Sequence, residues 1–206
     1  NLCKLIKISD QLVRTNNFKM KKTMPDFFEL YNKNVFIVGF GRIGKALSKR
    51  CIGFESKVYV YDPFIDSKVI KDNGCFAIKF EEGIKIADFI SIHIPLNEKT
   101  KYLIAKKEFS QMKKTCILVN TARGGIIKED DLVWALKNKI IYGAGLDVFE
   151  KEPPDDNNPL LKNKRIVLSP HAATFTNECR SSMSIETVQN VINFFENKLN
   201  KSMIVK

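Results

Sequence analysis

Short, almost unbroken runs of apolar residues recur along the chain from residue 34 onward. Val and Ile recur in these runs, and continuous apolar character is typical of strands that are buried on both faces of a parallel sheet. The runs span residues 34–39, 57–61, 88–94, 115–120, 142–148 and 165–169. Because helical segments separate several of them, the sequence predicts an α/β fold, a doubly wound parallel sheet with right-handed connections.

Helical periodicity is clearest in four segments, residues 1–14, 42–52, 128–138 and 176–199. The polar segment 15–33 contains Pro25 and is interpreted as a connector. The acidic loop EKEPPDDNNP, residues 150–159, is the longest break in the pattern. A loop of that length inside a compact domain is more often functional than idle.

The composition of 44% hydrophobic and 28% charged residues predicts a packed core in this chain of 206 residues. No apolar run approaches the roughly 20 residues that span a bilayer, so we expect no membrane partner. We also interpret the N-terminus as lacking a signal peptide. The odd number of cysteines, five, and the absence of a C-x-x-C pair favour reduced thiols and a cytoplasmic protein. The histidines, His93 and His171, lack partners at ligand spacing, so we expect no metal.

The formal net charge is +11. Such an excess is compatible with nucleic-acid binding, or with a solvated lysine-rich surface that attracts anionic ligands. The lysines are scattered, and the one tight cluster, KMKK at residues 19–22, has no interleaved aromatic residues. The pattern therefore favours the second interpretation, with no nucleic acid as a partner.

The hexapeptide GFGRIG follows the first predicted strand and opens a helix. In that context Gly39 permits a tight turn, Gly41 lets the backbone approach a pyrophosphate, and Gly44 lets the helix pack close to the sheet. Arg42 and Ile43 stand at the start of the helix, where backbone N–H groups favour phosphate oxygens. The motif predicts dinucleotide binding; glycines that only turn the chain are the alternative.

Asp62 ends the second predicted strand, 18 residues after Gly44. A carboxylate at this position accepts hydrogen bonds from ribose hydroxyls and repels a 2′-phosphate. Pro63 and Phe64 follow it, and no arginine does. Asp62 therefore favours NAD over NADP, unless it only starts the turn before Pro63.

Arg123 stands beyond a buried strand, in the stretch CILVNTARGGII. The carboxyl ends of parallel strands are where such sheets bind ligands, and a guanidinium suits a carboxylate. Gly124 and Gly125 follow and are expected to leave room for a ligand. We predict that Arg123 holds a substrate carboxylate; a salt bridge to Glu129 or Asp130 is the alternative.

Glu152 and His171 follow two later strands and are expected at the same edge of the sheet as Arg123. Histidine is a natural proton donor to a carbonyl that is being reduced, and a carboxylate can fix its tautomer. His171 alone could be an ordinary packing residue, but the three together predict a catalytic triad. His93 is followed closely by Pro95 and has no evident acidic partner, so we interpret it as structural or as a backbone contact near the cofactor.

The motifs VGFGRIG, HIPLNEKT, VNTARGGII, GAGLDVFEKEPP and LSPHAATFTNE resemble, in order, those of the NAD-dependent D-2-hydroxyacid dehydrogenases. The resemblance covers most of residues 34–187. That family includes phosphoglycerate dehydrogenase, glyoxylate/hydroxypyruvate reductase and D-lactate dehydrogenase. The chain is similar to the cofactor-binding domain of the family, a Rossmann domain.

The resemblance implies that Arg123 binds and polarises the substrate, that His171 is the acid/base, and that Glu152 is its partner. It implies that Asp147 holds the nicotinamide carboxamide. It also implies that the cofactor cleft is lined by Ile94, Pro95, Thr100, Thr121 and Ala122. Ala173, in the HAAT variant of the last motif, is expected to leave room for the nicotinamide.

By this resemblance, residues 1–33 are a linker helix and connector from an absent substrate domain on the N-terminal side. Residues 34–175 are the NAD-binding Rossmann domain, and residues 176–206 are a C-terminal helix and tail. The expected activity is hydride transfer between NAD and a D-2-hydroxy acid or 2-oxo acid, most similar to that of 3-phosphoglycerate dehydrogenase. The alternatives are glyoxylate/hydroxypyruvate reductase, D-lactate dehydrogenase, and an NAD-sensing binding protein of the corepressor type. We expect a homodimer.

Overall fold

The computed structural model describes residues 1–24 and 27–200. Pro25 and the predicted tail from residue 201 onward lie outside the described residues. The chain divides into two units, Asn1–His171 and Ala172–Lys206, and each is described by itself.

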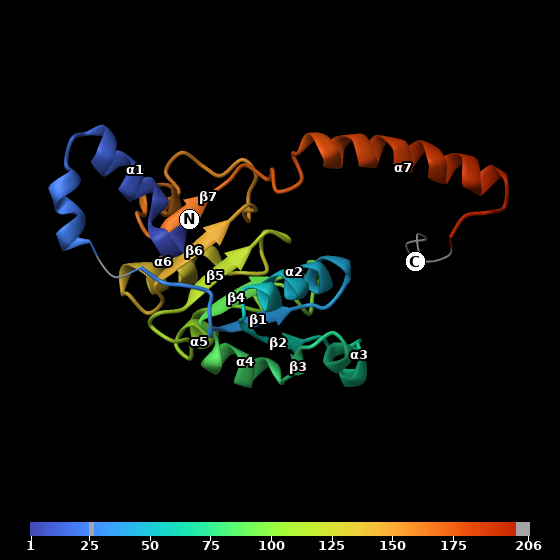
Figure 1. Cartoon of the computed structure of the whole chain (residues 1–206), viewed down its shortest axis with the longest axis horizontal. Helices are drawn as coiled ribbons and strands as arrows, with labels where there is room; N and C mark the ends of the chain where they lie inside the picture. Colours follow the sequence, from blue (N-terminus) through green and yellow to red (C-terminus); the bar gives the residue numbers. More distant parts are fainter. Residues whose placement is uncertain (25–26, 201–206) are drawn as a thin grey trace. The chain divides into compact units, whose positions relative to one another are not determined.

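One parallel sheet of seven strands forms the centre of the first unit, in the order β3-β2-β1-β4-β5-β6-β7 (Figure 1). The strands are β1 (Asn34–Val38), β2 (Lys57–Tyr61), β3 (Phe76–Ala77), β4 (Phe89–Ile92), β5 (Ile117–Asn120), β6 (Gly143–Leu146) and β7 (Ile166–Leu168). This order confirms the predicted doubly wound parallel sheet. Because the chain runs outward from β1 in both directions, the order reverses between β1 and β4, where such sheets bind ligands.

The first unit also contains several helices (Figure 1). The α-helices are α1 (Ile6–Arg14), α2 (Arg42–Gly53), α3 (Ser67–Asp72), α4 (Phe80–Ile86), α5 (Lys106–Phe109) and α6 (Glu129–Lys137). The 3₁₀ segments are η1 (Leu2–Lys4), η2 (Phe18–Thr23) and η3 (Pro159–Lys162). The sequence did not predict β3, α3, α4 or α5. These elements have two, six, seven and four residues, too few for a clear period.

Successive residues of β1 point to opposite faces of the sheet, and both faces are buried. Phe36 and Val38 belong to one apolar cluster, whereas Val35 and Ile37 belong to another. A strand that is covered on both sides needs apolar residues at every position, which explains the unbroken run in the sequence. The rigid sheet that results fixes where the loops at its carboxyl edge begin.

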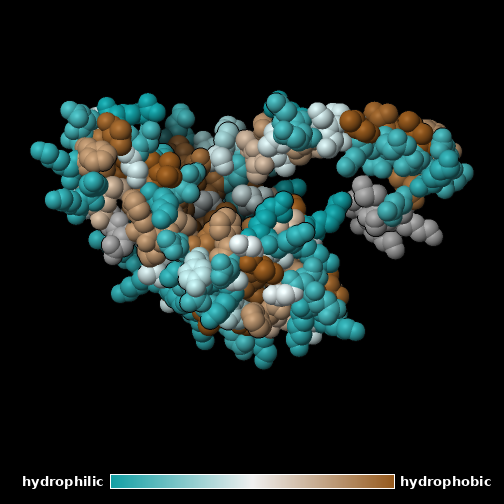
Figure 2. Space-filling model, viewed as in Figure 1, coloured by the Kyte–Doolittle hydropathy of each residue, from teal (hydrophilic) through white to brown (hydrophobic). Residues whose placement is uncertain are grey.

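The second unit contains α7 (Asn177–Phe195), which begins after the cap residue Thr176. The Cys179 N–H donates to Oγ1 of Thr176 over 3.1 Å. Large exposed apolar side chains along the helix are those of Met183, Ile185, Val188, Val191, Ile192, Phe194 and Phe195. Part of the surface of α7 is accordingly brown in Figure 2. Among the described helices, none is both long and apolar enough to cross a membrane.

Candidate active site

The glycines of the turn after β1 differ in what surrounds them. Gly39 has φ +98°, and a Cβ there would lie 2.6 Å from the carbonyl oxygen of His93. A Cβ on Gly44 would lie 2.1 Å from the carbonyl oxygen of Gly39. At Gly41, by contrast, a Cβ would meet nothing within 4 Å. The first two glycines are therefore required by backbone packing, whereas Gly41 borders open space.

This open space lies at the N-terminus of α2. Gly41 is the N-cap residue, and no side chain caps the helix. Arg42 and Ile43 form its first turn and are exposed, Ile43 to 68%. Uncapped N–H groups and the helix dipole favour phosphate oxygens, so this turn fits a pyrophosphate.

The carboxylate of Asp62 joins the end of β2 to the glycine turn. Its Oδ2 accepts a hydrogen bond from the Phe40 N–H at 2.7 Å, and its Oδ1 accepts one from the Phe64 N–H at 2.9 Å. The bond from Phe64 fits the alternative interpretation, in which Asp62 starts the turn before Pro63. Each carboxylate oxygen has a further lone pair, so two backbone bonds leave Asp62 able to accept ribose hydroxyls.

A cavity of about 450 Å³ adjoins Asp62. Its walls come from β2, β3 and the segments that follow them, and include Ile65, Ala77 and Ile78. Lys79 and Glu82 also line the cavity. Apolar residues beside a carboxylate are suited to an adenosine, with its flat base and its ribose hydroxyls. The described residues thus fit both the phosphate and the adenosine parts of a dinucleotide.

The segment after β4 lies against the glycine turn. The side chain of Ile94 would lie 2.7 Å from a Cβ on Gly39. Thr100 Oγ1 donates to the Pro95 carbonyl over 2.7 Å and accepts the Asn97 N–H over 2.8 Å. The Thr100 hydroxyl therefore fixes the turn that carries Pro95, and Ile94, just before this turn, packs beside Gly39.

Hydrogen bonds hold His93 at the end of β4. Its N–H donates to the Val38 carbonyl over 2.7 Å, and its Nε2 lies 2.9 Å from Ser91 Oγ. Burial lowers the pKa of the His93 imidazole below its ordinary value. These contacts support the structural interpretation of His93.

Arg123 follows β5 on a turn that is held by Asn120. Asn120 is 1% exposed; its Nδ2 donates to the Arg123 carbonyl over 2.8 Å, and its Oδ1 accepts the Ala122 N–H over 3.0 Å. The Arg123 side chain is exposed and donates from Nη1 to the Ala122 carbonyl over 2.6 Å. Among residues 1–24 and 27–200, no carboxylate forms an ion pair with it. The alternative salt bridge to Glu129 or Asp130 is therefore absent.

The glycines after Arg123 have a backbone role that differs from the expected one. A Cβ on Gly124 would lie 1.7 Å from the carbonyl oxygen of Phe149, and Gly125 has φ +76°. They permit a close backbone contact and a left-handed turn rather than simply leaving room for a ligand.

His171 and Glu152 form a hydrogen-bonded pair. His171 Nδ1 lies 2.7 Å from Glu152 Oε2, and Glu152 Oε1 accepts the Phe149 N–H over 3.0 Å. These two bonds, the histidine bond first, lower the pKa of the Glu152 carboxyl. An ionised carboxylate only accepts, so Nδ1 carries the proton and Nε2 faces away from Glu152. The His171 side chain is 53% exposed.

Asp147 connects the ends of three neighbouring strands. It is 2% exposed, and its Oδ1 accepts the Ser169 hydroxyl over 2.6 Å. Its N–H donates to the Asn120 carbonyl, and its carbonyl accepts the His171 N–H over 2.8 Å. Asp147 thus fixes the turn of His171 relative to β5 and β6. Ala173 belongs to the second unit, so its cofactor contact stays a prediction.

Residues 1–173 match the family model of the D-isomer specific 2-hydroxyacid dehydrogenase, NAD binding domain. The chain belongs to this family. The predicted resemblance is thereby confirmed, and so is NAD as the cofactor of the domain.

The dehydrogenase domain is similar to longer proteins of several names. It is 40% identical over 203 residues to a glyoxylate reductase of Thermococcus litoralis, covering 96% of this chain and 61% of that protein. It is 40% identical over 166 residues to a D-3-phosphoglycerate dehydrogenase of Bacillus subtilis, covering 81% of this chain and 31% of that protein. Among the curated relatives, the glyoxylate reductase of Korarchaeum cryptofilum is matched over 60% of its length.

A solved structure supports the same fold. The D-lactate dehydrogenase with NAD+ from Lactobacillus jensenii has a TM-score of 0.85 and 29% identity, with 100% of this chain and 64% of that chain covered. The names of these relatives refer to different 2-oxo or 2-hydroxy acid substrates.

The carboxyl edge of the sheet carries the exposed Arg123 guanidinium and the hydrogen-bonded His171–Glu152 pair. A bound NAD supplies the hydride acceptor or donor. A histidine that is oriented by a carboxylate can exchange a proton at Nε2, and a guanidinium that forms no ion pair among the described residues can bind an anion. Among the described residues, no group of three His, Cys, Asp or Glu could hold a metal ion.

Sequence reasoning missed Asn120, Ser169 and the backbone of Phe149 as parts of this site. The only sequence signal of Asn120 is a polar residue that ends an apolar run. Ser169 acts through Asp147, which is distant in the sequence. Phe149 lies close to Glu152 in the sequence but acts through its backbone N–H, which a motif of side chains does not show.

Proposed function

We propose that this chain is the cofactor-binding and proton-transferring part of an oxidoreductase that interconverts a D-2-hydroxy acid and its 2-oxo acid. The observation that carries the proposal is the 2.7 Å hydrogen bond between His171 and Glu152. It lies at the carboxyl edge of the same sheet whose β5 leads to Arg123. The Arg123 guanidinium has no carboxylate partner among the described residues.

In the proposed reaction, Arg123 binds the substrate carboxylate and polarises the carbonyl. His171 gives a proton from Nε2 to the carbonyl oxygen during reduction and takes it back during oxidation. Glu152 accepts the Nδ1–H and stabilises the imidazolium. Asp147 holds the nicotinamide carboxamide, and the walls of the cleft come from Ile94, Pro95, Thr100, Thr121, Ala122 and Ala173.

Asp62 is proposed to select NAD over NADP. Its carboxylate adjoins the cavity that suits adenosine and carries negative charge where a 2′-phosphate would lie. Titration calorimetry tests this selection, and the expected result is tighter binding of NADH than of NADPH.

The preference for 3-phosphoglycerate stays a proposal. Glyoxylate reductases and phosphoglycerate dehydrogenases both match at 36–40% identity. A homodimer and a cytoplasmic setting also stay proposals. Sedimentation of the protein at micromolar concentration tests the dimer.

The experiment that tests the function is a substrate panel with the full-length protein. NADH oxidation is followed with glyoxylate, hydroxypyruvate, pyruvate and phosphohydroxypyruvate. Turnover of at least one 2-oxo acid is expected. NADH binding without turnover of any of them would favour the alternative, an NAD-sensing binding protein.

A further inference from the structure

The dipeptide Phe149–Glu150 lies between the two loops that carry the proposed catalytic residues. The Phe149 carbonyl packs against Gly124, next to Arg123, so closely that a Cβ on Gly124 would lie 1.7 Å away. The Phe149 N–H donates to Glu152 Oε1 over 3.0 Å. The position of this peptide therefore affects the Arg123 loop and the Glu152 carboxylate together.

A reciprocal pair of hydrogen bonds holds this peptide to the start of α6. The Glu150 N–H donates to Glu129 Oε1 over 2.6 Å, and the Glu129 N–H donates to Glu150 Oε1 over 2.6 Å. Lys128, the N-cap residue of α6, makes no side-chain cap. Glu150 thus caps the helix from 21 residues away, where the helix dipole favours its negative charge.

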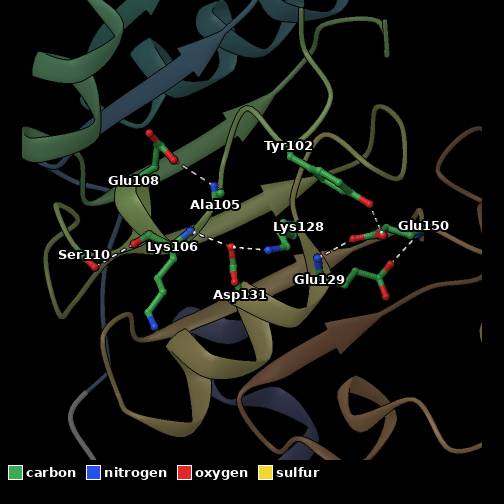
Figure 3. Close-up of polar contacts among 9 residues, drawn as sticks. All are labelled: Tyr102, Ala105, Lys106, Glu108, Ser110, Lys128, Glu129, Asp131 and Glu150. Carbon is green, nitrogen blue, oxygen red and sulfur yellow. Dashed lines mark hydrogen bonds and ion pairs between the residues drawn. The ribbon is translucent and has the colours of Figure 1, made fainter. Parts of the chain in front are cut away.

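Tyr102 adds a third contact, to the Glu150 side chain (Figure 3), and its backbone contacts the loop that follows Arg123. Its hydroxyl donates to Glu150 Oε2 over 3.0 Å, and its N–H donates to the Gly125 carbonyl over 2.8 Å. The hydrogen bond to Glu150 raises the pKa of the Tyr102 phenol above its ordinary value of 10.0. The second oxygen of Glu129 accepts from Asn158 Nδ2 over 3.1 Å.

We propose that Glu129, Glu150 and Tyr102, here called the carboxylate clasp, are positioning residues that orient Glu152 toward His171. The inference rests on the proposed function of the Glu152–His171 pair. The Glu152 side chain is 37% exposed, so packing alone does not fix its rotamer. Its orientation depends on the Phe149 N–H, and the clasp fixes that N–H by holding the next residue at both its backbone and its side chain. Such support holds a catalytic group within the narrow range of geometry that proton transfer needs.

The test reads the tautomer of His171 by ¹⁵N NMR of the 206-residue protein labelled at histidine. The chain has two histidines, so His93 provides an internal reference. At alkaline pH the wild type is expected to show His171 protonated at Nδ1. In Glu150→Ala, the population of the His171 tautomer protonated at Nε2 is expected to increase. In Tyr102→Phe the same increase is expected to be smaller. His93 signals are expected to stay unchanged in both.

Two controls separate positioning from general damage. Glu81→Ala removes an exposed glutamate from the first turn of another helix, α4, and is expected to leave the His171 signals unchanged. Glu150→Gln keeps an oxygen that can accept the Glu129 N–H and is expected to restore most of the wild-type signal. Tyr102→Phe deletes one exposed hydroxyl and carries the test if Glu150→Ala does not fold.

In the full-length protein, Glu150→Ala is expected to lower kcat by about tenfold, with KM for NADH within about twofold of wild type, as for residues that orient a catalytic group. An unchanged His171 tautomer and unchanged kcat in Glu150→Ala and Tyr102→Phe would overturn the clasp. The proposed function fails on a different result, namely wild-type turnover in His171→Ala.

Discussion

The carboxylate of Asp62 accepts the Phe40 N–H at 2.7 Å, and this bond joins the end of β2 to the glycine turn after β1. Phe40 lies inside GFGRIG and is fully buried. The residue proposed to select NAD therefore also shapes the turn proposed to bind its pyrophosphate. The two halves of the cofactor site depend on each other.

Replacement of Asp62 is expected to affect stability as well as binding. Asp62→Ala leaves the buried Phe40 N–H without its partner, at a cost of about 1–3 kcal/mol in the free energy of unfolding. It is also expected to weaken NADH binding at least about tenfold, since ribose hydrogen bonds to a charged group are lost. Urea unfolding and calorimetry measure the two effects. Asp72→Ala, at the exposed end of α3, is the control. An equal loss of stability and NADH binding in Asp72→Ala would contradict the role of Asp62.

The glycines of α2 are expected to separate folding from cofactor binding. Gly41→Ala enters open space at φ −70° and is expected to cost at most about 1 kcal/mol of stability as an N-cap change. It is expected to weaken NADH binding at least about tenfold, because its methyl group occupies the pyrophosphate position. Gly44→Ala is expected to destabilise the fold, since its Cβ would lie 2.1 Å from a carbonyl oxygen. Gly53→Ala also enters open space, and it should leave NADH binding unchanged.

The ionisation of Glu152 is expected to depend on His171. The hydrogen bond from His171 and then that from Phe149 lower the pKa of the Glu152 carboxyl below its ordinary value of 4.5. The stability from these bonds is present above pH 4.5 and is lost as the pH falls through the lowered pKa. A carbon-13 NMR titration should place the Glu152 midpoint below 4.5, and His171→Ala should raise it. An unchanged midpoint would show that the pair does not form in solution.

His93 is expected to make stability depend on pH near neutrality. Burial lowers the pKa of folded His93 below its ordinary value of 6.5, so the unfolded chain binds a proton more readily. Stability should therefore fall as the pH drops from above 6.5 toward the lowered pKa. The measurement compares the urea midpoints of wild type and His93→Gln at several pH values. The difference between the two proteins isolates His93, because all other titrating groups contribute equally to both. If the urea midpoint depended on pH equally in both proteins, a contribution of His93 to the pH dependence of stability would be excluded.

Most of the sheet could be predicted from the sequence because buried parallel strands have continuous apolar runs. The elements between β2 and β4 could not, since β3 has two residues and α3 and α4 are short. These short elements are stabilised by tertiary contacts, such as the parallel pairing of Tyr59 in β2 with Phe76 in β3.

The candidate site was predictable where chemistry is carried by side chains within motifs, as for Arg123 and His171. It was not predictable where backbone groups hold those side chains in place. Gly124 is the example: the sequence indicated space for a ligand, and the structure shows a carbonyl of Phe149 against it. The hydrogen bonds between Glu129 and Glu150 likewise join segments 21 residues apart, outside the span of any motif.

The most direct test of the proposed catalytic role is the kcat of His171→Ala in the full-length protein, measured with NADH and the best 2-oxo acid of the panel. General acids contribute about 10²–10⁴-fold, so kcat is expected to fall by that factor. NADH binding, measured by calorimetry on the same sample, is expected to be retained. His93→Gln is the matched control and should keep near wild-type turnover. Near wild-type kcat in His171→Ala would contradict the assignment of His171 as the proton donor.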